Sequence, residues 1–384
     1  MRALDNCRVL DFGIITAGAA TSALLADLGA EVIKIESPTY RDPFRIWTGE
    51  ERQVDDRPPL FRATNRNKAA ISIDLKQPRG REVMLRLVAA SDVVVENFRR
   101  GVLPQLGLSF EELRRANGRI VLASVSSHGE TGPDSRHVSY GSTLEAVAGL
   151  AWNTGYAGEA PVVSGRDVNY PDQVAAIFAA GMIATALRAV RDGGPAVHLD
   201  LSQRDLTSFL VGDTFVAAST GDATGRQGNA REPYLLQDCF LASDGAWVAL
   251  SVRRADVERL APIVGAGPRD EGRRLRERVS RHVAAFPSDQ VIAALRAAGL
   301  AAAPVLDGAG VMQLEGTAWT HALSRADGGV VKGFPFQIDA MPLVIESSAP
   351  SIGADTRRIL AELGGYAPSE IVELAQAGVI ELGD

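Results

Sequence analysis

The chain has 384 residues, 46% of them hydrophobic and 23% charged, which indicates one large or two ordinary globular domains. Its formal net charge of −7 argues against a nucleic-acid partner, because phosphate binding requires clustered Lys and Arg. Cys7 and Cys239 belong to no Cys/His cluster, so the sequence predicts no metal site, and two isolated thiols fit a reducing compartment.

The N-terminus enters a strand pattern directly and carries no signal-peptide apolar region. The longest apolar run, Val174 to Val190, is mostly Ala and is interrupted by Thr185 and Arg188. It is too weakly apolar for a membrane span, and we interpret it as a buried core helix. We therefore expect a cytoplasmic protein with no membrane partner.

The first 125 residues alternate between strand and helix patterns. A capping box of Ser109 and Glu112 marks the start of one helix, since each residue satisfies a free backbone donor. Such alternation predicts a doubly wound, mostly parallel, Rossmann-like α/β domain. Strands are expected at 8–12, 31–36, 70–75, 92–96 and 120–124, and helices at 17–28, 79–90 and 110–116.

The rest of the chain predicts a second, smaller α+β domain. A loop at 126–171 precedes the Ala-rich helix, a strand is expected at 197–201, and Gly-rich residues 220–231 indicate a linker. The predicted organisation is a large domain at 1–200, a linker within 201–230 and a small domain at 231–324. Further strands are expected at 239–241 and 247–251, and helices at 269–281, 289–298, 355–363 and 369–377.

The turn after the first strand, Gly13 to Gly18, resembles a nucleotide-binding turn only in part. It is neither G-x-G-x-x-G nor a P-loop, although Glu36 ends the second strand where a ribose-binding carboxylate would lie. A nicotinamide dehydrogenase and ordinary βαβ packing are both open interpretations. The small residues of the turn would let phosphates approach the helix N-terminus.

Two polar segments lie near the ends of predicted strands. Residues 65–68 (Asn-Arg-Asn-Lys) and Lys76 flank the third strand and indicate either an anion site or a solvated basic edge. Residues 96–99 follow the fourth strand, where open α/β sheets bind ligands. There Asn97 is suited to hydrogen-bond a heterocycle and Phe98 to pack on it. The alternative is a helix cap with a core aromatic residue.

Asp172 precedes the Ala-rich run, and its position has two interpretations. As a helix cap it would accept bonds from free backbone N–H groups. As a nucleophile it would be kept anionic by the helix dipole and would attack a thioester carbonyl, giving a mixed anhydride. Backbone N–H groups of neighbouring small residues would then hold the oxyanion. Asp167 is the second candidate.

Taken together, the chain resembles the family III CoA-transferases, the group that includes formyl-CoA and carnitine CoA-transferases. The resemblance covers nearly the whole chain, and its specificity comes from the order and spacing of many segments. The matching segments are residues 9–38, 65–76, 93–133, 137–156, 164–173, 228–234, 240–252 and 349–365.

The resemblance implies roles for particular residues. Asp172 falls on the catalytic aspartate, which forms an aspartyl-acyl anhydride and then an aspartyl-CoA thioester. Acyl-CoA and a carboxylic acid would be the substrates, with no tightly bound cofactor. The positions that resemble the coenzyme A contacts are Ile15, Thr16, Ala17, Ile73, Lys76, Asn97 and Phe98, and Arg99 is a candidate for binding the phosphates.

The chain departs from the family pattern at several positions. Some members have Arg where Ser37 stands, or basic residues near Gln105 and Val138; Arg41, Arg45, Arg99 or Arg100 would have to supply that charge. Thr16 replaces the Gln of formyl-CoA transferase. The segment nearest to the mobile Gly-rich loop of that enzyme is 225–229.

The same superfamily contains the α-methylacyl-CoA racemases, which use a His and an Asp. The racemase His position carries Tyr140 here, although His137 lies close by and keeps this alternative open. A homologue that binds coenzyme A without catalysis is a third interpretation. The resemblance also implies a homodimer of interlinked rings, in which residues 325–384 return to the large domain and the site lies between two chains.

Overall fold

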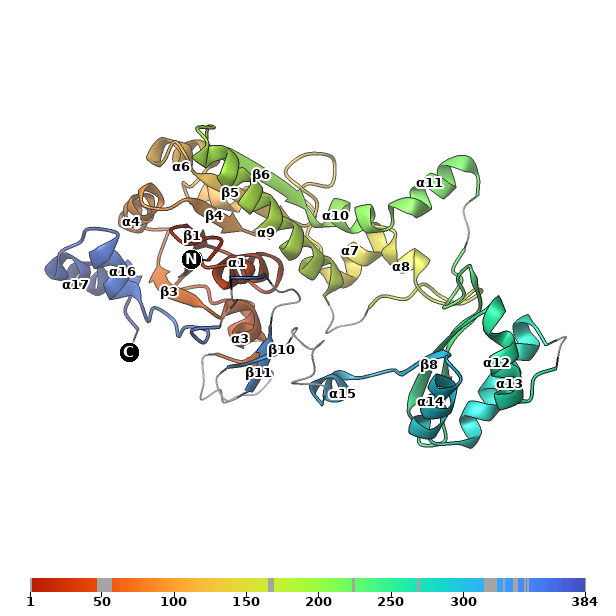
Figure 1. Cartoon of the computed structure of the whole chain (residues 1–384). Helices are drawn as coiled ribbons and strands as arrows, with labels where there is room; N and C mark the ends of the chain where they lie inside the picture. The colour runs from red at the N-terminus through yellow and green to blue at the C-terminus, as the bar shows by residue number, and fades with distance from the viewer. Residues whose placement is uncertain are drawn as a thin grey trace. The chain divides into compact units, whose positions relative to one another are not determined.

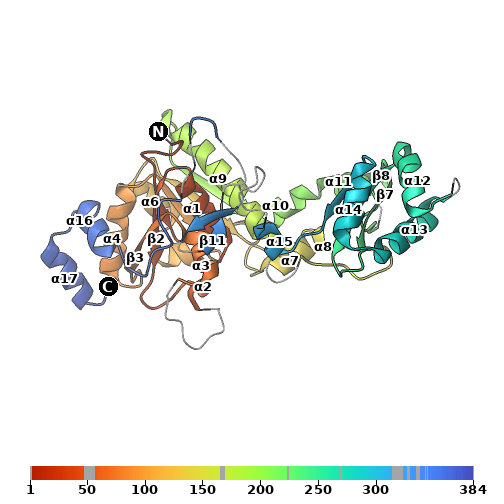
Figure 2. The same cartoon turned by 60° about the horizontal axis from the view of Figure 1, so that its bottom comes forward.

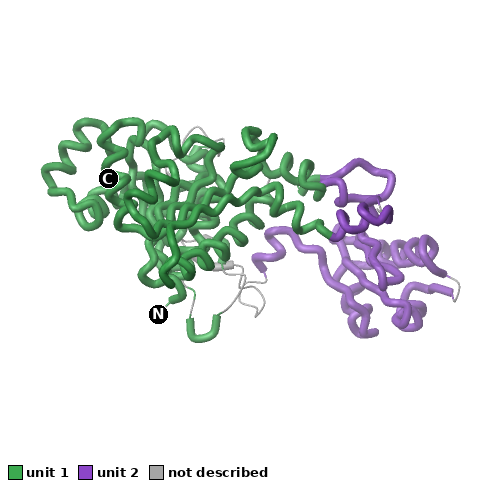
Figure 3. Tube along the Cα trace, turned by 90° about the horizontal axis from the view of Figure 1, so that it is seen from above, with its two compact units in different colours: residues 1–150, 163–212, 321–384 green, residues 151–162, 213–320 purple. Residues whose placement is uncertain are grey.

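The computed structural model describes residues 2–46, 57–164, 169–222, 225–267, 270–313, 323–326, 329–333, 338–341, 343 and 345–383. The chain divides into two compact units, which are described separately (Figure 3). Unit 1 contains residues 1–150, 163–212 and 321–384, and unit 2 contains residues 151–162 and 213–320.

Unit 1 is built on a seven-stranded sheet within the described residues, in the order β12-β3-β2-β1-β4-β5-β6 (Figure 1). All neighbouring strands are parallel except β12, which is antiparallel to β3. The prediction of a mostly parallel α/β domain is confirmed. The strands are β1 (Arg8–Asp11), β2 (Glu31–Glu36), β3 (Lys68–Ile73), β4 (Val93–Glu96), β5 (Val121–Ser126), β6 (Val197–Ser202) and β12 (Ile380–Glu381).

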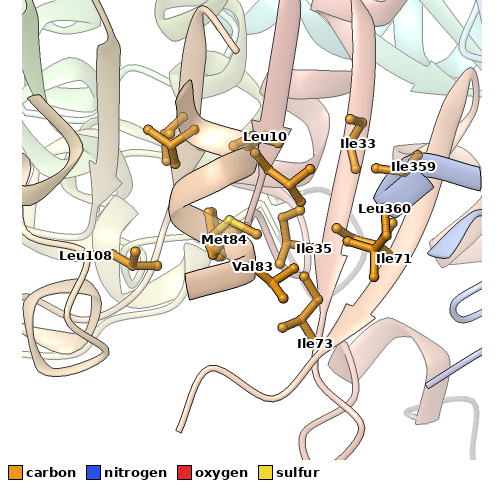
Figure 4. Packing of buried hydrophobic residues seen from close by; sticks show 14 of the residues in the cluster. Leu10, Ile33, Ile35, Ile71, Ile73, Val83, Met84, Leu108, Ile359 and Leu360 are labelled. Carbon is orange, nitrogen blue, oxygen red and sulfur yellow. The ribbon is translucent and has the colours of Figure 1, made fainter. Parts of the chain in front are cut away.

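Helices cover both faces of this sheet, as alternating apolar side chains require. Val9 and Val32 belong to one core with α1 (Ala17–Asp27) and α9 (Tyr170–Arg191). Leu10, Ile33 and Ile71 belong to a second core, which Figure 4 shows from close by. The helices of that second face are α4 (Pro78–Ala89), α6 (Phe110–Ala116), α16 (Thr356–Glu362) and α17 (Pro368–Gln376) (Figure 2).

Helix α9 is the Ala-rich helix expected from the sequence. By length and composition alone it would suit a membrane span, but in the fold it has nine buried residues, including Ala175, Ala179 and Ile183. These residues join the core that α1 and the sheet form. The interpretation as a core helix is therefore confirmed, whereas the expectation that the run is too weakly apolar for a membrane span is wrong.

Unit 2 contains the three-stranded antiparallel sheet β7-β8-β9. Val248 and Leu250 of β8 share a core with Leu275 and Val279, which recur every four residues along α13. The elements of this sheet and its helices are β7 (Tyr234–Leu241), β8 (Trp247–Arg253), β9 (Ala301–Pro304), α12 (Val257–Val264), α13 (Gly272–Ala285) and α14 (Ser288–Ala297).

The segment 201–230, expected as a linker, contains the helices α10 (Gln203–Leu210) and α11 (Gly212–Thr220). Ser202 caps α10 by accepting a hydrogen bond from the Asp205 N–H at 3.2 Å. None of the residues of α11 is buried. Helical structure therefore extends further along this segment than the Gly-rich composition near residue 225 indicates.

Candidate active site

Asp172 lies in the first turn of α9. The helix begins at Tyr170 with Asn169 as its N-cap, so Asp172 is the third helical residue. The interpretation of Asp172 as the helix cap is therefore wrong, as is the expectation that it begins the helix. The carboxylate accepts a hydrogen bond from its own backbone N–H and another from a residue outside its helix. Asp167, the alternative nucleophile, lies outside the described residues.

Two further helices begin beside Asp172. The first residue of α10, Gln203, donates a hydrogen bond from Nε2 to Asp172 Oδ1 at 3.0 Å. Gly141 is the first residue of α7 (Gly141–Val147), and a methyl group on its Cα would come 3.5 Å from Asp172 Oδ2. The N-termini of α7, α9 and α10 therefore meet at one carboxylate, and their positive ends favour its anion.

Burial opposes the stabilisation of the Asp172 anion by the helix N-termini. Removal from water raises the pKa of Asp172 above its ordinary value, while the Gln203 amide and the residue's own backbone N–H lower it. The helix dipole alone therefore does not set the pKa of Asp172. Burial opposes it, and burial cannot be read from one position in the sequence. The result is a carboxylate that is poorly solvated yet held by directed donors, which is typical of activated groups in enzyme sites.

The turn expected to contact coenzyme A connects β1 to α1. Gly13 and Gly18 lie so close together that a Cβ on Gly13 would come 2.3 Å from the Gly18 carbonyl carbon. Ile15 has φ of 58° and is partly buried, whereas Thr16 and Ala17 are almost fully buried. Thr16 is the N-cap of α1, although its side chain makes no capping hydrogen bond.

Asn97 and Phe98 follow β4 beside this turn. The Asn97 side chain accepts from the Ile14 N–H at 2.8 Å and donates to the Ile14 carbonyl at 3.0 Å. Phe98 packs edge-on against Phe12, with ring centroids 6.3 Å apart. The structure therefore brings Asn97 together with the turn, and the protein itself uses the amide that we expected to face a ligand.

The remaining predicted contacts are dispersed. Ile73 is fully buried in the core of unit 1, so its side chain is closed to a ligand in this structure. Lys76 and Arg99 are exposed, at the turns that follow β3 and β4. In the described part of the chain, neither of these two cationic groups has an ion-pair partner. They are the basic groups of the predicted set that remain open to a phosphate.

Other basic candidates are already paired. Arg41 makes two bonds of 2.9 and 3.0 Å with Glu381. Arg45 is buried, contacts Glu36 at 2.6 Å and stacks over the Phe61 ring at 3.6 Å. Glu36 thus has both oxygens engaged by Arg45, and its interpretation as a ribose-binding carboxylate is wrong.

For Arg66 and Lys68 both interpretations, an anion site and a solvated edge, are wrong, whereas the exposed Lys76 remains compatible with either. Lys68 is buried and contacts Asp11 at 2.8 Å, and Arg66 is buried against Asp27. Burial lowers the pKa of Lys68 to about 8, although Asp11 opposes the shift. The carboxylates lie 57 and 39 residues away, so the pairing was hidden from local sequence.

The sequence patterns did not single out Gln203 or Gly141, which lie beside Asp172 in the structure. The position of Gln203 just after a predicted strand was an available signal. Glu96, part of the predicted ligand-binding segment 96–99, has a feature that the sequence does not reveal: burial raises its pKa to about 7, and Ser124 hydrogen-bonds it. Ser124 in turn lies 3.0 Å from His198 Nε2, in a small pocket with Arg99.

The residues of the racemase interpretation are solvent-facing. The His137 side chain is 68% exposed and lies 3.5 Å from Asp134, and Tyr140 is 64% exposed. Tyr140 is the N-cap of α7, directly before Gly141. Among the described residues, no group of three or more His, Cys, Asp or Glu could hold a metal ion.

Fold and site together define an α/β protein with a partly buried carboxylate at the carboxyl ends of parallel strands, where open sheets of this class bind ligands. Residues 4–356 match the family model described as CoA-transferase family III, and the chain belongs to this family. The resemblance found in the sequence is thereby confirmed.

The similarity to known proteins extends over most of the chain. An acetyl-CoA:oxalate CoA-transferase from Acetobacter aceti is 31% identical over 87% of this chain and 88% of its own. A succinate–glutarate CoA-transferase from Agrobacterium fabrum is 27% identical over 94% and 95%. The crystal structure of a CaiB/BaiF family protein from Brucella suis superposes with a TM-score of 0.84 at 26% identity, covering 94% of this chain and 99% of that one.

Proposed function

We propose that this family III CoA-transferase moves coenzyme A from an acyl-CoA donor to a carboxylic acid, with Asp172 as the covalent nucleophile. The observation that carries the proposal is the partly buried Asp172 carboxylate, which lies at three helix N-termini and accepts a hydrogen bond from Gln203. One relative is named for acetyl-CoA and oxalate, and another is named for succinate and glutarate. This chain would act on substrates of the same chemical class.

The reaction would proceed in four balanced steps. An Asp172 oxygen attacks the donor's thioester carbonyl, and the C–S bond breaks to release the CoA thiolate and leave a mixed anhydride. The thiolate attacks the aspartyl carbonyl, which forms the enzyme thioester and releases the donor acid. The acceptor carboxylate then attacks this thioester, giving a new anhydride and free thiolate. The thiolate finally attacks the acceptor's carbonyl, forming the product and freeing Asp172.

The surroundings of Asp172 suit these steps. Each attack places negative charge on a carbonyl oxygen, and backbone N–H groups at helix N-termini stabilise such charge. Because Gly141 has no side chain, the backbone at the start of α7 can lie close to Asp172 Oδ2. Gln203 would hold the other oxygen and orient the plane of the carboxylate.

Coenzyme A would bind along the carboxyl ends of β1, β3 and β4. The turn at Ile15, Thr16 and Ala17 would contact it through backbone groups, and the exposed Lys76 and Arg99 would pair with its phosphates. Because Lys76 and Arg99 lie at two different turns, they suit a ligand whose phosphates are at separate positions.

We further propose that the enzyme works as a homodimer. Large apolar side chains are exposed on α10 and α11: Phe209 is 71% exposed, Val216 is 66% exposed and Phe215 is 50% exposed. A helix without a buried residue, such as α11, lacks the packing that stabilises helices in proteins. A second copy of the chain would supply that packing and complete the site.

The covalent step can be tested directly. Incubation with an acyl-CoA followed by borohydride should reduce the enzyme thioester and leave a mass change that maps to Asp172. Asp172→Ala should lose the modification and reduce turnover by a factor of at least about 10³, as the loss of a covalent nucleophile does. Asp192→Ala, an exposed Asp at the other end of α9, is the matched control and should behave as wild type.

The outcomes separate the competing functions. Normal transfer by Asp172→Ala would refute the proposed nucleophile. Deuterium uptake at the α-carbon without an acceptor acid would indicate a racemase instead. Coenzyme A binding without label exchange between thioester and free acid would indicate a protein that binds but does not catalyse.

A further inference from the structure

Buried side chains hold the backbone of the turn between β1 and α1. The Gly13 N–H donates to Asp11 Oδ1 at 2.8 Å, and the Gly13 carbonyl accepts from Lys34 Nζ at 2.7 Å. Asn97 pairs with both polar groups of Ile14. The Ile15 N–H donates to Asp42 Oδ1 at 3.2 Å. Five consecutive backbone groups are therefore fixed by side chains from four separate segments.

The charged members of this set lie deep in the protein. Asp11 is 0% exposed, Lys34 is 1% exposed and Asp42 is 2% exposed. Lys34 joins the turn to Asp42, because its ammonium group donates to Asp42 Oδ2 at 3.0 Å as well as to Gly13. Apolar residues of similar size would serve packing alone at least as well, so a buried pair of this kind calls for another reason.

The conformation of Ile15 supplies that reason. Its φ of 58° lies in the left-handed region, which is a strained conformation for a β-branched residue. Such strain persists only where the surroundings over-determine the conformation. Asp42 Oδ1 accepts from the N–H of Ile15 itself and also from the Phe44 N–H at 2.9 Å, so Asp42 anchors the strained residue directly.

Ile15 is followed by backbone N–H donors that have no acceptor among the described residues. Thr16 caps α1 without a side-chain bond, and no described residue accepts from the backbone N–H groups of Ala17 or Gly18. The first N–H groups of a helix have no partners within it and bind anionic or carbonyl oxygens well. The direction in which they point depends on the conformation of Ile15.

We propose that Asp42, oriented by Lys34, is a positioning residue that holds Ile15 left-handed so that the first N–H groups of α1 remain aimed at coenzyme A. This inference rests on the proposed function, because it takes the turn to be part of the coenzyme A site. It adds two residues, Asp42 and Lys34, that contact no substrate and set the geometry of those that do.

The test compares Asp42 with an equally buried carboxylate of the same region. Asp27, on α1, is 1% exposed and pairs with Arg66, so Asp27→Ala and Asp27→Asn reproduce the loss of a buried pair away from the turn. Titration with coenzyme A should give Asp42→Ala a Kd about tenfold above that of Asp27→Ala, the effect of one lost hydrogen bond to a charged group. Asp42→Asn should lie between, because its amide oxygen can still accept from Ile15.

Steady-state kinetics separate positioning from general damage. In Asp42→Ala the KM for the CoA thioester should rise about tenfold while the KM for the acceptor acid stays within twofold of the control. Equal coenzyme A affinities in the Asp42 and Asp27 variants would overturn the inference. If the Ala variants do not fold, the Asn pair decides on the same criterion. Failure of the wild-type enzyme to bind coenzyme A would instead refute the proposed function, and this inference with it.

Discussion

Two effects shift the pKa of Asp172 in opposite directions. Burial raises its pKa, whereas the Gln203 amide and nearby helix N-termini favour the anion. A carboxylate in water is a weak nucleophile because it is well solvated. Removing that solvation while keeping one directed donor gives a group that can attack a thioester and also leave again from an anhydride.

The role of Gln203 leads to a prediction about pH. Its amide donor stabilises the ionised form of Asp172, so Gln203→Leu should raise the pKa of Asp172. If the anion is the nucleophile, as proposed, the acid limb of kcat/KM should move toward higher pH by about one unit, the equivalent of one hydrogen bond to a charged group. Gln376→Leu, an exposed substitution in α17, is the control and should leave the profile unchanged. A limb that stays in place or moves to lower pH would contradict this role.

For single residues, the sequence suggested Asp172 as a candidate nucleophile but did not predict its contacts. Asp172 could be chosen because it precedes a long apolar run in a recognisable pattern. Gln203 comes from 31 positions further along, and Lys68 is neutralised by an Asp 57 positions away. Such pairings depend on how strands and helices come together, and local charge patterns do not contain them.

Secondary-structure elements were more predictable than contacts. The expected helix 110–116 is α6, and both bonds of its capping box are present: the Ser109 Oγ accepts from the Glu112 N–H at 3.4 Å, and the Ser109 N–H donates to Glu112 Oε2 at 3.1 Å. By contrast, β12 has only two residues, too few for a side-chain period, and β9 (Ala-Ala-Ala-Pro) shows neither alternation nor β-branched residues. These short strands exist because they complete sheets formed by other segments.

The capping box gives a prediction for α6. Ser109→Ala should lower the free energy of unfolding by about 1 kcal/mol, because a free N–H at the start of the helix loses its acceptor. Ser109→Asp should restore most of this loss, since a carboxylate can accept the same bond. Chemical denaturation followed by circular dichroism measures both variants. A loss in Ser109→Ala that Ser109→Asp does not recover would show that the cap is not its cause.

For the whole molecule, the proposed homodimer predicts a native mass of twice the 40.7-kDa chain. Val216→Asp would place a charge on the exposed apolar side of α11, and burying it in an interface would cost several kcal/mol. This variant should shift the mass toward one chain in analytical ultracentrifugation. Val372→Asp in α17, also at an exposed Val, should leave the mass unchanged. A single-chain mass for wild type, or equal behaviour of the two variants, would contradict the proposal.

The position of β12 has a consequence for how the protein is made. Ile380 and Glu381 pair with Ile73 and Ser72 at the edge of the large sheet, and Glu381 also binds Arg41. While a ribosome is still synthesising the middle of the chain, the edge of β3 must therefore lack its partner for roughly 300 codons, a period of tens of seconds at ordinary elongation rates. Unpaired strand edges invite association with other chains. We expect the nascent protein to be prone to association through this edge until residues 380–381 have emerged.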